Sequence, residues 1–112
     1  MDFRRSTLAE GILIIEVELG DTGPLVERLT SKNHGYAIRG LDDKVAVIDG
    51  RLRKKRWCTE DHMLALEAHE CGHLLADTDD EPTAERKAIE LLEEHGHIAA
   101  ANILRERGIL VE

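Results

Sequence analysis

The sequence predicts an α+β fold: a short mixed β-sheet packed on one long helix, followed by an antiparallel helical hairpin. Three observations predict it. Short runs rich in Ile and Val, separated by turn-forming residues, occupy the first half of the 112-residue chain. Apolar residues at helical spacing occupy the second half, from about residue 60 onward. Short connections between the helical stretches favour antiparallel neighbours.

The first half is expected to supply the sheet. Residues 1–10 are polar, which indicates a short helix or a frayed start. Ile12–Leu19 is rich in Ile and Val and alternates after Ile15, which predicts a strand. Pro24 suits the first turn of a helix, and three apolar residues follow it at helical spacing, namely Leu25, Val26 and Leu29.

A β-hairpin is expected next. Tyr36–Leu41 and Lys44–Asp49 are β-prone runs, and the two residues between them, Asp42 and Asp43, fit a hairpin by length. Arg51–Arg56 then holds five cations in six residues. Such a run is either a patch for nucleic acid or an acidic partner, or a solvated loop that offsets nearby acids. The net charge of −8 favours the solvated loop.

The second half is expected to be helical. Thr59 is a good N-cap, and acidic residues follow it in the first turn, where the helix dipole favours anions. The first long helix is therefore expected to span Glu60–Ala76. A short loop leads to a second helix, Glu81–His95, and a third is expected over His97–Arg107, ended by Gly108. The second helix has an apolar stripe made of Ala84, Ala88, Leu91 and Leu92.

Composition narrows the class of protein. Apolar residues make up 42% and charged residues 34% of the chain, as is typical of a soluble globular protein, and the length fits one domain over residues 1–112. An acidic net charge argues against nucleic-acid binding, and the lack of a long apolar run argues against a membrane span or a signal peptide. Two cysteines, Cys58 and Cys71, make no disulfide framework, so a cytoplasmic location is expected.

A metal-binding pattern lies inside the first long helix. His69-Glu70-Cys71-Gly72-His73 has the form H-E-x-x-H. Residues four apart share a helix face, so the imidazoles of His69 and His73 can hold one metal ion from one side. Glu70 projects from a neighbouring position, within reach of a water on that metal, as in zinc peptidases. The alternative is two surface histidines on an ordinary core helix.

Other polar residues have weaker sequence signals for a role at the metal site. Cys71 is expected to be a buried structural thiol that points away from the metal. His62 and His95 lie about 10 Å or more along their helices from the metal level, at about 1.5 Å per residue, and are expected to be surface or hairpin-end residues. His34 and Tyr36 are candidates for a hydrogen bond to a developing oxyanion.

The second helix offers the third protein ligand that a catalytic zinc site requires. If the two helices pack antiparallel, counting back from their short loop pairs Glu81 with His73 and Glu85 with His69. One carboxylate is expected to complete a His₂Glu site for Zn²⁺. The other is expected to accept a hydrogen bond from the outer nitrogen of His69. The residues alone leave the choice between Glu81 and Glu85 open.

These residues resemble the gluzincin pattern H-E-x-x-H … E-x-x-A-[D/N/E]. The second part of the pattern corresponds here to Glu81, Ala84 and Glu85. The stretch that starts at Val45 and leads into the motif is similar to ImmA/IrrE-type and minimal gluzincin peptidases. The tail from Ala88 resembles small phage-type metallopeptidase domains. The resemblance covers roughly residues 36–108.

The resemblance implies a zincin-like fold with Glu81 as the third ligand and Glu85 in the surrounding shell. Only seven residues separate His73 from Glu81, fewer than is usual for these peptidases, so Glu85 stays a rival ligand. The implied activity is zinc-dependent hydrolysis of a peptide bond. Glu70 would take the proton of the attacking water and deliver it to the leaving amine.

The expected partner is a peptide or protein substrate, aligned along one strand of the hairpin by main-chain hydrogen bonds. The competing function is a non-catalytic zinc-binding protein, with a structural, virion or regulatory role, that keeps the fold. The ImmA/IrrE resemblance also implies a third possibility, a regulator that cleaves one repressor.

Overall fold

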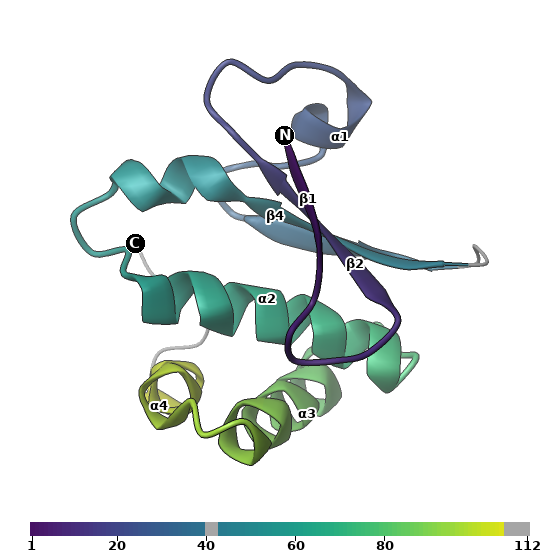
Figure 1. The fold of residues 1–112 in the computed structure, drawn as a ribbon, viewed down its shortest axis with the longest axis vertical. Helices are drawn as coiled ribbons and strands as arrows, with labels where there is room; N and C mark the ends of the chain where they lie inside the picture. Colours follow the sequence, from purple (N-terminus) through teal and green to yellow (C-terminus); the bar gives the residue numbers. More distant parts are fainter. Residues whose placement is uncertain (40–42, 107–112) are drawn as a thin grey trace.

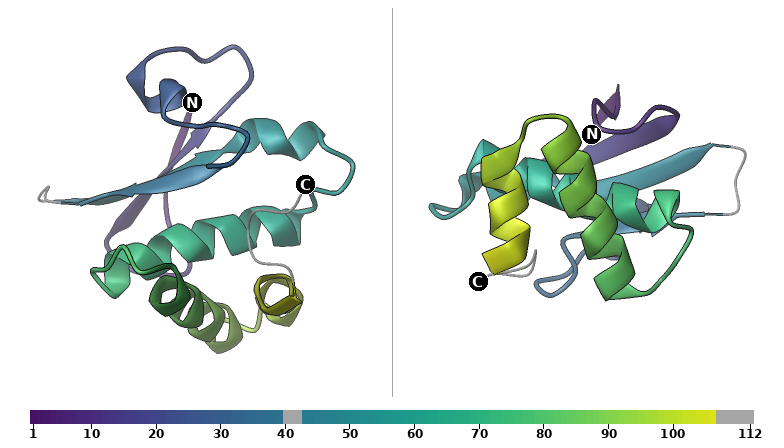
Figure 2. Two further views of the ribbon diagram at one scale, coloured as in Figure 1. Left: turned by 180° about the vertical axis from the view of Figure 1, so that it is seen from behind. Right: turned by 90° about the horizontal axis from the view of Figure 1, so that it is seen from below.

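The computed structural model describes residues 1–39 and 43–106, arranged in layers (Figure 1). A four-stranded sheet packs on helix α2, and α3 and α4 lie on the far side of α2 (Figures 1 and 2). The elements in chain order are β1 (Asp2–Arg5), β2 (Ile12–Val17), α1 (Pro24–Glu27), β3 (Gly35–Ile38), β4 (Lys44–Asp49), the 3₁₀ helix η1 (Gly50–Lys54), α2 (Glu60–Leu75), α3 (Glu81–Glu94) and α4 (Ile98–Glu106).

The sheet is mixed and has the strand order β1-β2-β4-β3. The central strands β2 and β4 are parallel, with Ile14 opposite Ala46. The outer pairs are antiparallel, β1 with β2 and β3 with β4. An α+β architecture with a small mixed sheet and a following group of helices is therefore confirmed. Strand β3 is an edge strand of this sheet, and α2 contacts both β3 and its neighbour β4.

Both faces of the two central strands are covered, which explains why their sequences are almost continuously apolar. Alternate residues point to opposite faces of a sheet. Ile12 and Ile14 of β2 join the cluster between the sheet and α2. Ile15 and Val17 join a second cluster on the other face, which the segment around α1 covers. A third cluster joins α2 to α3 and α4 and contains mostly alanine and leucine.

The N-terminus is a strand, so the expectation of a short helix or frayed start over residues 1–10 is wrong. Strand β1 pairs with β2, with Phe3 opposite Ile15. The side chain of Arg4 reaches across to Glu16 on β2 and Glu67 on α2, at 3.2 and 3.1 Å. These partners are distant in the sequence, and the four residues of β1 carry no local sign of them.

Helix α2 has the bounds that its sequence predicts, to within one residue. The backbone N–H of His62 donates to the Thr59 hydroxyl, and the backbone N–H of Thr59 donates to the His62 ring, at 3.3 and 3.2 Å. This reciprocal pair caps the start of the helix. At the end, Asp77 adopts a left-handed conformation with φ of 48°. Most of α2 is buried, because the sheet covers one side and α3 and α4 cover another.

Helix α3 follows α2 after a five-residue loop and runs back across it at an angle (Figure 2). The predicted apolar stripe of α3 is buried: Ala84, Ala88, Leu91 and Leu92. The closest approach is at Gly72, where an added Cβ would lie 2.2 Å from the carbonyl oxygen of Ala84. Only a glycine at this position lets the two backbones come so close.

Two expected ends lie partly outside the described residues. The strand expected over Tyr36–Leu41 and the turn expected at Asp42 and Asp43 reach into residues 40–42, which the structure does not describe. The expected helix end at Arg107 and the stop at Gly108 likewise lie outside the described residues. Helix α1 is a single turn, shorter than the apolar spacing predicts. Within the described residues, no helix combines the length and apolar character needed to cross a membrane.

The basic run forms η1 and the loop after it. Arg53 donates to both carboxylate oxygens of Glu16, at 2.7 and 3.0 Å, and also pairs with Glu60. Arg51 makes a two-point contact with Asp49, at 2.8 and 3.0 Å. Two of the five cations thus offset nearby acids, in agreement with the solvated-loop interpretation.

Candidate metal centre

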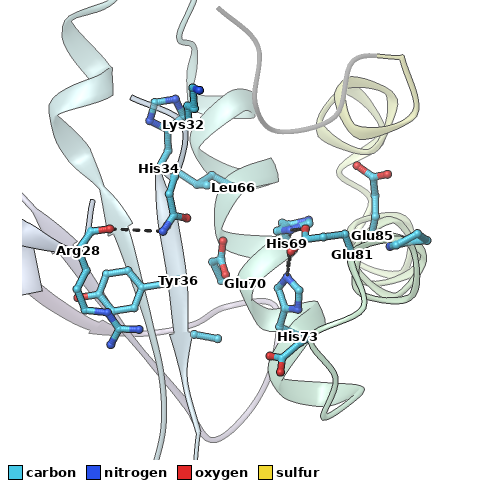
Figure 3. Close-up of a pocket in the computed structure, with 15 residues that line it drawn as sticks. Arg28, Lys32, His34, Tyr36, Leu66, His69, Glu70, His73, Glu81 and Glu85 are labelled. Atoms are coloured by element: carbon cyan, nitrogen blue, oxygen red, sulfur yellow. Dashed lines mark hydrogen bonds and ion pairs between the residues drawn. The ribbon is translucent and has the colours of Figure 1, made fainter. Parts of the chain in front are cut away.

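Three side chains converge at the junction of α2 and α3 (Figure 3). His69 and His73 lie one turn apart on α2, and their Nε2 atoms are 3.2 Å apart. Glu81, the first residue of α3, places one oxygen 2.7 Å from Nε2 of His69 and the other 3.1 Å from Nε2 of His73. The three residues are close enough to hold one metal ion.

The donor types suit a metal ion such as zinc, and two of the three separations between donor atoms, 3.2 and 3.1 Å, are near those of a tetrahedral site. With zinc–nitrogen and zinc–oxygen bonds of about 2.0–2.1 Å, tetrahedral ligand atoms lie about 3.3 Å apart. The 3.2 Å between the two Nε2 atoms is near that value. The shorter contact of Glu81 with His69, at 2.7 Å, has the length of a hydrogen bond. Two imidazoles and one carboxylate would supply three ligands to such an ion, the number that catalytic zinc sites take from the protein.

The ring of His73 is oriented for metal binding. Its Nδ1 lies 2.8 Å from the backbone carbonyl of Thr78, in the loop between α2 and α3. A carbonyl only accepts, so Nδ1 carries the proton of this hydrogen bond, and in the matching neutral tautomer the lone pair of Nε2 would be available to a metal ion. Such outer hydrogen bonds fix the tautomer of metal-binding histidines.

The ring of His69 lacks the hydrogen bond that was expected for it. Its Nδ1 is buried and has no hydrogen-bond partner within the described part of the chain. Glu85 therefore does not accept a hydrogen bond from this nitrogen. Burial lowers the pKa of His69, opposed by the nearby charge of Glu81. A lowered pKa keeps the imidazole neutral, which is the form that binds a metal.

The carboxylate that reaches both histidines is Glu81. Counting along antiparallel helices pairs Glu81 with His73 alone and Glu85 with His69. In the structure α3 is inclined to α2, and the close contact at Gly72 brings the first turn of α3 over both rings. Glu85, one turn further along α3, lines the adjoining cleft and is not part of the three-residue cluster.

Glu70 lies between strand β3 and His69 (Figure 3). Its side chain is 5% exposed, and burial raises the pKa of its carboxyl to about 8, with a smaller contribution from the charge of Glu81. Gly35 makes room for it, because an added Cβ there would be 3.0 Å from Oε2 of Glu70 and 3.1 Å from the carbonyl oxygen of Val47. A carboxyl that titrates near neutral pH suits a general base.

A cleft of about 860 Å³ opens over these residues. Its walls come from α2 and the start of α3 on one side, and from β3 and the segment before it on the other. Of the two hairpin strands considered for substrate alignment, β4 lies between β2 and β3, so only β3 is an edge. The edge strand therefore borders the cleft that contains His69, Glu70 and His73.

Four other polar residues take structural positions. The hydroxyl of Tyr36 donates to the carbonyl of Leu25 at 2.7 Å, on the sheet face away from α2, so it does not face the histidines. Cys71 is fully buried against the sheet, and burial raises the pKa of its thiol to about 12. His62 caps α2, and the ring of His95 donates to the carbonyl of Leu91 at 2.9 Å. His34, the other oxyanion candidate, is buried and lines the cleft.

Two features of the site have no clear sequence signal. The carbonyl of Thr78 belongs to the backbone, which any residue would supply. Gly35 leaves space above Glu70, and a single glycine before a strand carries no sequence sign of that role.

Comparison with protein-family models, curated proteins and solved structures found no match for this chain. The gluzincin resemblance therefore depends on the motif residues and their spacing.

Proposed function

We propose that this protein is a zinc-dependent peptidase whose metal ligands are His69, His73 and Glu81. The observation that carries the proposal is the convergence of these three donors within hydrogen-bond distance of one another, on the wall of a cleft that also holds a buried glutamate. The gluzincin resemblance, carried by the same residues, assigns them the same roles.

Zinc bound there would supply a Lewis acid that lowers the pKa of a water molecule and polarises the scissile carbonyl. Glu70 would accept the proton of that water and return it to the leaving amine. With no metal bound, the pKa of Glu70 is about 8, so its carboxyl is largely protonated at neutral pH. A nearby cation lowers the pKa of a carboxyl, which would bring Glu70 into its basic form.

A peptide substrate would lie along β3 as an added strand. Among residues 1–39 and 43–106, no strand pairs with the outer edge of β3. Main-chain hydrogen bonds to such an edge give affinity without regard to sequence, and side-chain pockets give specificity. A strand in this position would run past Glu70 and His69, which is the support for a peptide as the substrate class.

One observation favours a second function, a non-catalytic zinc-binding protein with a structural, virion or regulatory role. The three donors come from two helices, so a bound ion would join α2 to α3. An ion that links two elements stabilises the fold whether or not it takes part in catalysis.

Substitution of Glu70 by Gln separates the two functions. Gln has nearly the same volume and shape but cannot act as a base. For a peptidase, we expect Glu70→Gln to retain about one zinc per chain and to lose 10²- to 10⁴-fold or more of its turnover, roughly the contribution of general acid–base catalysis. The measurements are zinc content by elemental analysis and cleavage of a degenerate peptide library by mass spectrometry.

Glu60→Gln is the matched control, because it makes the same change on α2 at an exposed position outside the cleft. Cleavage that survives Glu70→Gln at the wild-type rate would come from a contaminating protease and would remove the support for the mechanism. A zinc-loaded wild type that cleaves nothing in the library would favour the non-catalytic function.

A further inference from the structure

Two basic side chains line the cleft on the side opposite to Glu81. Arg28 follows α1, and Lys32 lies in the segment that leads to β3. Figure 3 shows both on the β3 side, with His69, His73, Glu81 and Glu85 on the other side and Glu70 between the two groups. The two walls of one cleft therefore carry charges of opposite sign.

Arg28 and Lys32 have no carboxylate partner among the described residues, in contrast to five arginines elsewhere in the chain. Arg4, Arg39, Arg51, Arg53 and Arg105 each form ion pairs. Neither Arg28 nor Lys32 forms an ion pair with any residue that the structure describes. In a protein with a net charge of −8, two such cations at one wall of a cleft are suited to receive an anion from outside the chain.

Arg28 is held in place although it is exposed. Its guanidinium lies 4.1 Å from the centroid of the Tyr36 ring, a cation–π contact. The side-chain amide of Asn33 donates to the backbone carbonyl of Arg28 at 3.4 Å. The hydroxyl of Tyr36 is fixed in turn on the carbonyl of Leu25. A guanidinium stacked on an aromatic ring keeps its edge N–H groups free to bind a carboxylate.

The side chains of β3 point alternately to the two faces of the sheet, which places Arg28 within reach of one face of a peptide bound along β3. Gly35 and Ala37 face α2, since Gly35 lies over Glu70 and Ala37 packs in the cluster between sheet and helix. Tyr36 faces the opposite side, where Arg28 stacks on it. On an added strand, a residue directly opposite a strand residue shares its face. A residue beside Tyr36 would thus direct its side chain toward Arg28, while its neighbours face Glu70.

We propose that Arg28 and Lys32 form an anion-recognising subsite that selects peptides with a carboxylate close to the bond held at the metal centre. The inference depends on the peptidase proposal for its substrate class. The carboxylate is either an Asp or Glu side chain within the peptide or a C-terminal carboxylate, because the two cations recognise the same chemistry in both.

Binding to a protein that cannot cleave tests the subsite apart from catalysis. The zinc-loaded Glu70→Gln protein is mixed with acetylated hexapeptide pools that are degenerate except at one position, and retained peptides are measured by ultrafiltration and mass spectrometry. Three amidated pools carry Glu, Gln or Lys at that position, and a fourth carries Gln with a free C-terminus. We expect the Glu pool or the free-acid pool to be retained about five- to tenfold better than the amidated Gln pool, because only a carboxylate accepts charge-assisted hydrogen bonds from the two cations.

The pool that gains identifies the source of the carboxylate. Replacement of both cations, Arg28→Gln with Lys32→Gln, should abolish the preference. The matched control, Lys54→Gln with Lys55→Gln, makes the same charge change at exposed positions outside the cleft and should keep it. Equal retention of all four pools, or a preference that survives the Arg28 and Lys32 changes, overturns the subsite. If the Glu70→Gln protein retains the carboxylate-bearing pools selectively but the wild type cleaves no peptide, only the peptidase proposal is overturned.

Discussion

At the scale of single residues, the metal centre depends on one carboxylate that contacts two imidazoles. Glu81 is 69% exposed, yet its two oxygens reach Nε2 of His69 and Nε2 of His73. The histidines are buried and fixed on α2, and Thr78 orients one of them. The two histidines are therefore fixed by their helix, and the exposed glutamate is the donor with the greatest freedom to move.

We expect Glu81→Ala to weaken zinc binding by well over 100-fold and Glu85→Ala to weaken it by less than about tenfold. Loss of an outer-shell hydrogen bond typically costs 10- to 100-fold in affinity, and Glu85 makes no such bond to His69. Competition titration with a chromophoric zinc chelator measures both affinities. If Glu85→Ala abolished binding while Glu81→Ala did not, the two glutamates would exchange roles.

The sequence predicts the two histidines of this cluster and two candidate glutamates, but not the contacts among them. H-E-x-x-H places His69 and His73 on one helix face because the spacing matches the helical repeat. The choice between Glu81 and Glu85 depends on how α3 crosses α2, which residue counting along parallel axes does not capture. The contact of Glu81 with both rings follows from that crossing, and no spacing rule contains it.

At the scale of elements, the close crossing of α2 and α3 positions Glu81. The backbone of α3 approaches α2 at Gly72, between the two histidines of the motif. A methyl group at this position would meet the carbonyl oxygen of Ala84, a backbone atom that moves only with its helix. Any larger residue must therefore displace the first turns of α3 from the imidazoles.

We expect Gly72→Ala to lower the free energy of unfolding by about 1–3 kcal/mol, the usual cost of overpacking, and also to weaken zinc binding. Chemical denaturation and chelator competition give the two quantities. Cys71→Ala is the control, because the thiol of Cys71 lies in the cluster between the sheet and α2, 3.7 Å from the hydroxyl of Ser6. That change should destabilise the protein and leave zinc affinity unchanged. Unchanged zinc affinity in Gly72→Ala would show that the crossing does not position Glu81.

The elements themselves were predicted unevenly, for physical reasons. Helices α2 and α3 carry local signals in their caps, apolar spacing and proline, and their bounds agree with the sequence to within one residue. Strand β1 has no such signal, since its pairing with β2 and the reach of Arg4 to Glu67 are long-range. The parallel pairing of β2 with β4 is also long-range, and a hairpin pattern predicts only the pairing of β3 with β4.

At the scale of the whole molecule, the buried carboxylate of Glu16 on β2 links strand β1 to η1 through Arg4 and Arg53. The side chain of Glu16 is 8% exposed and accepts hydrogen bonds from Arg53 and Arg4. These contacts, with those of Arg53 largest, hold the pKa of Glu16 below its ordinary value of 4.5. The folded state therefore favours the ionised carboxylate, so the contribution is full above about pH 4.5 and is lost as pH falls through the lower, folded pKa.

We expect Glu16→Gln to lower the free energy of unfolding at pH 7 by about 1–3 kcal/mol, as for hydrogen bonds to charged groups. The difference from wild type should shrink as the pH falls below about 4. Urea denaturation at a series of pH values measures it, with Glu10→Gln, an exposed residue, as the control for loss of one charge. A difference that stays constant down to pH 3 would contradict the role of the carboxylate.

The metal centre is tested most directly by the zinc content of the purified chain. Protein prepared without chelator and then reconstituted with Zn²⁺ is analysed for zinc per chain, beside His69→Ala and His73→Ala. We expect about one zinc per wild-type chain and a large loss in either variant, because two imidazoles and one carboxylate suit this metal. A wild-type content well below one that reconstitution does not raise, or full zinc in both variants, would contradict the site.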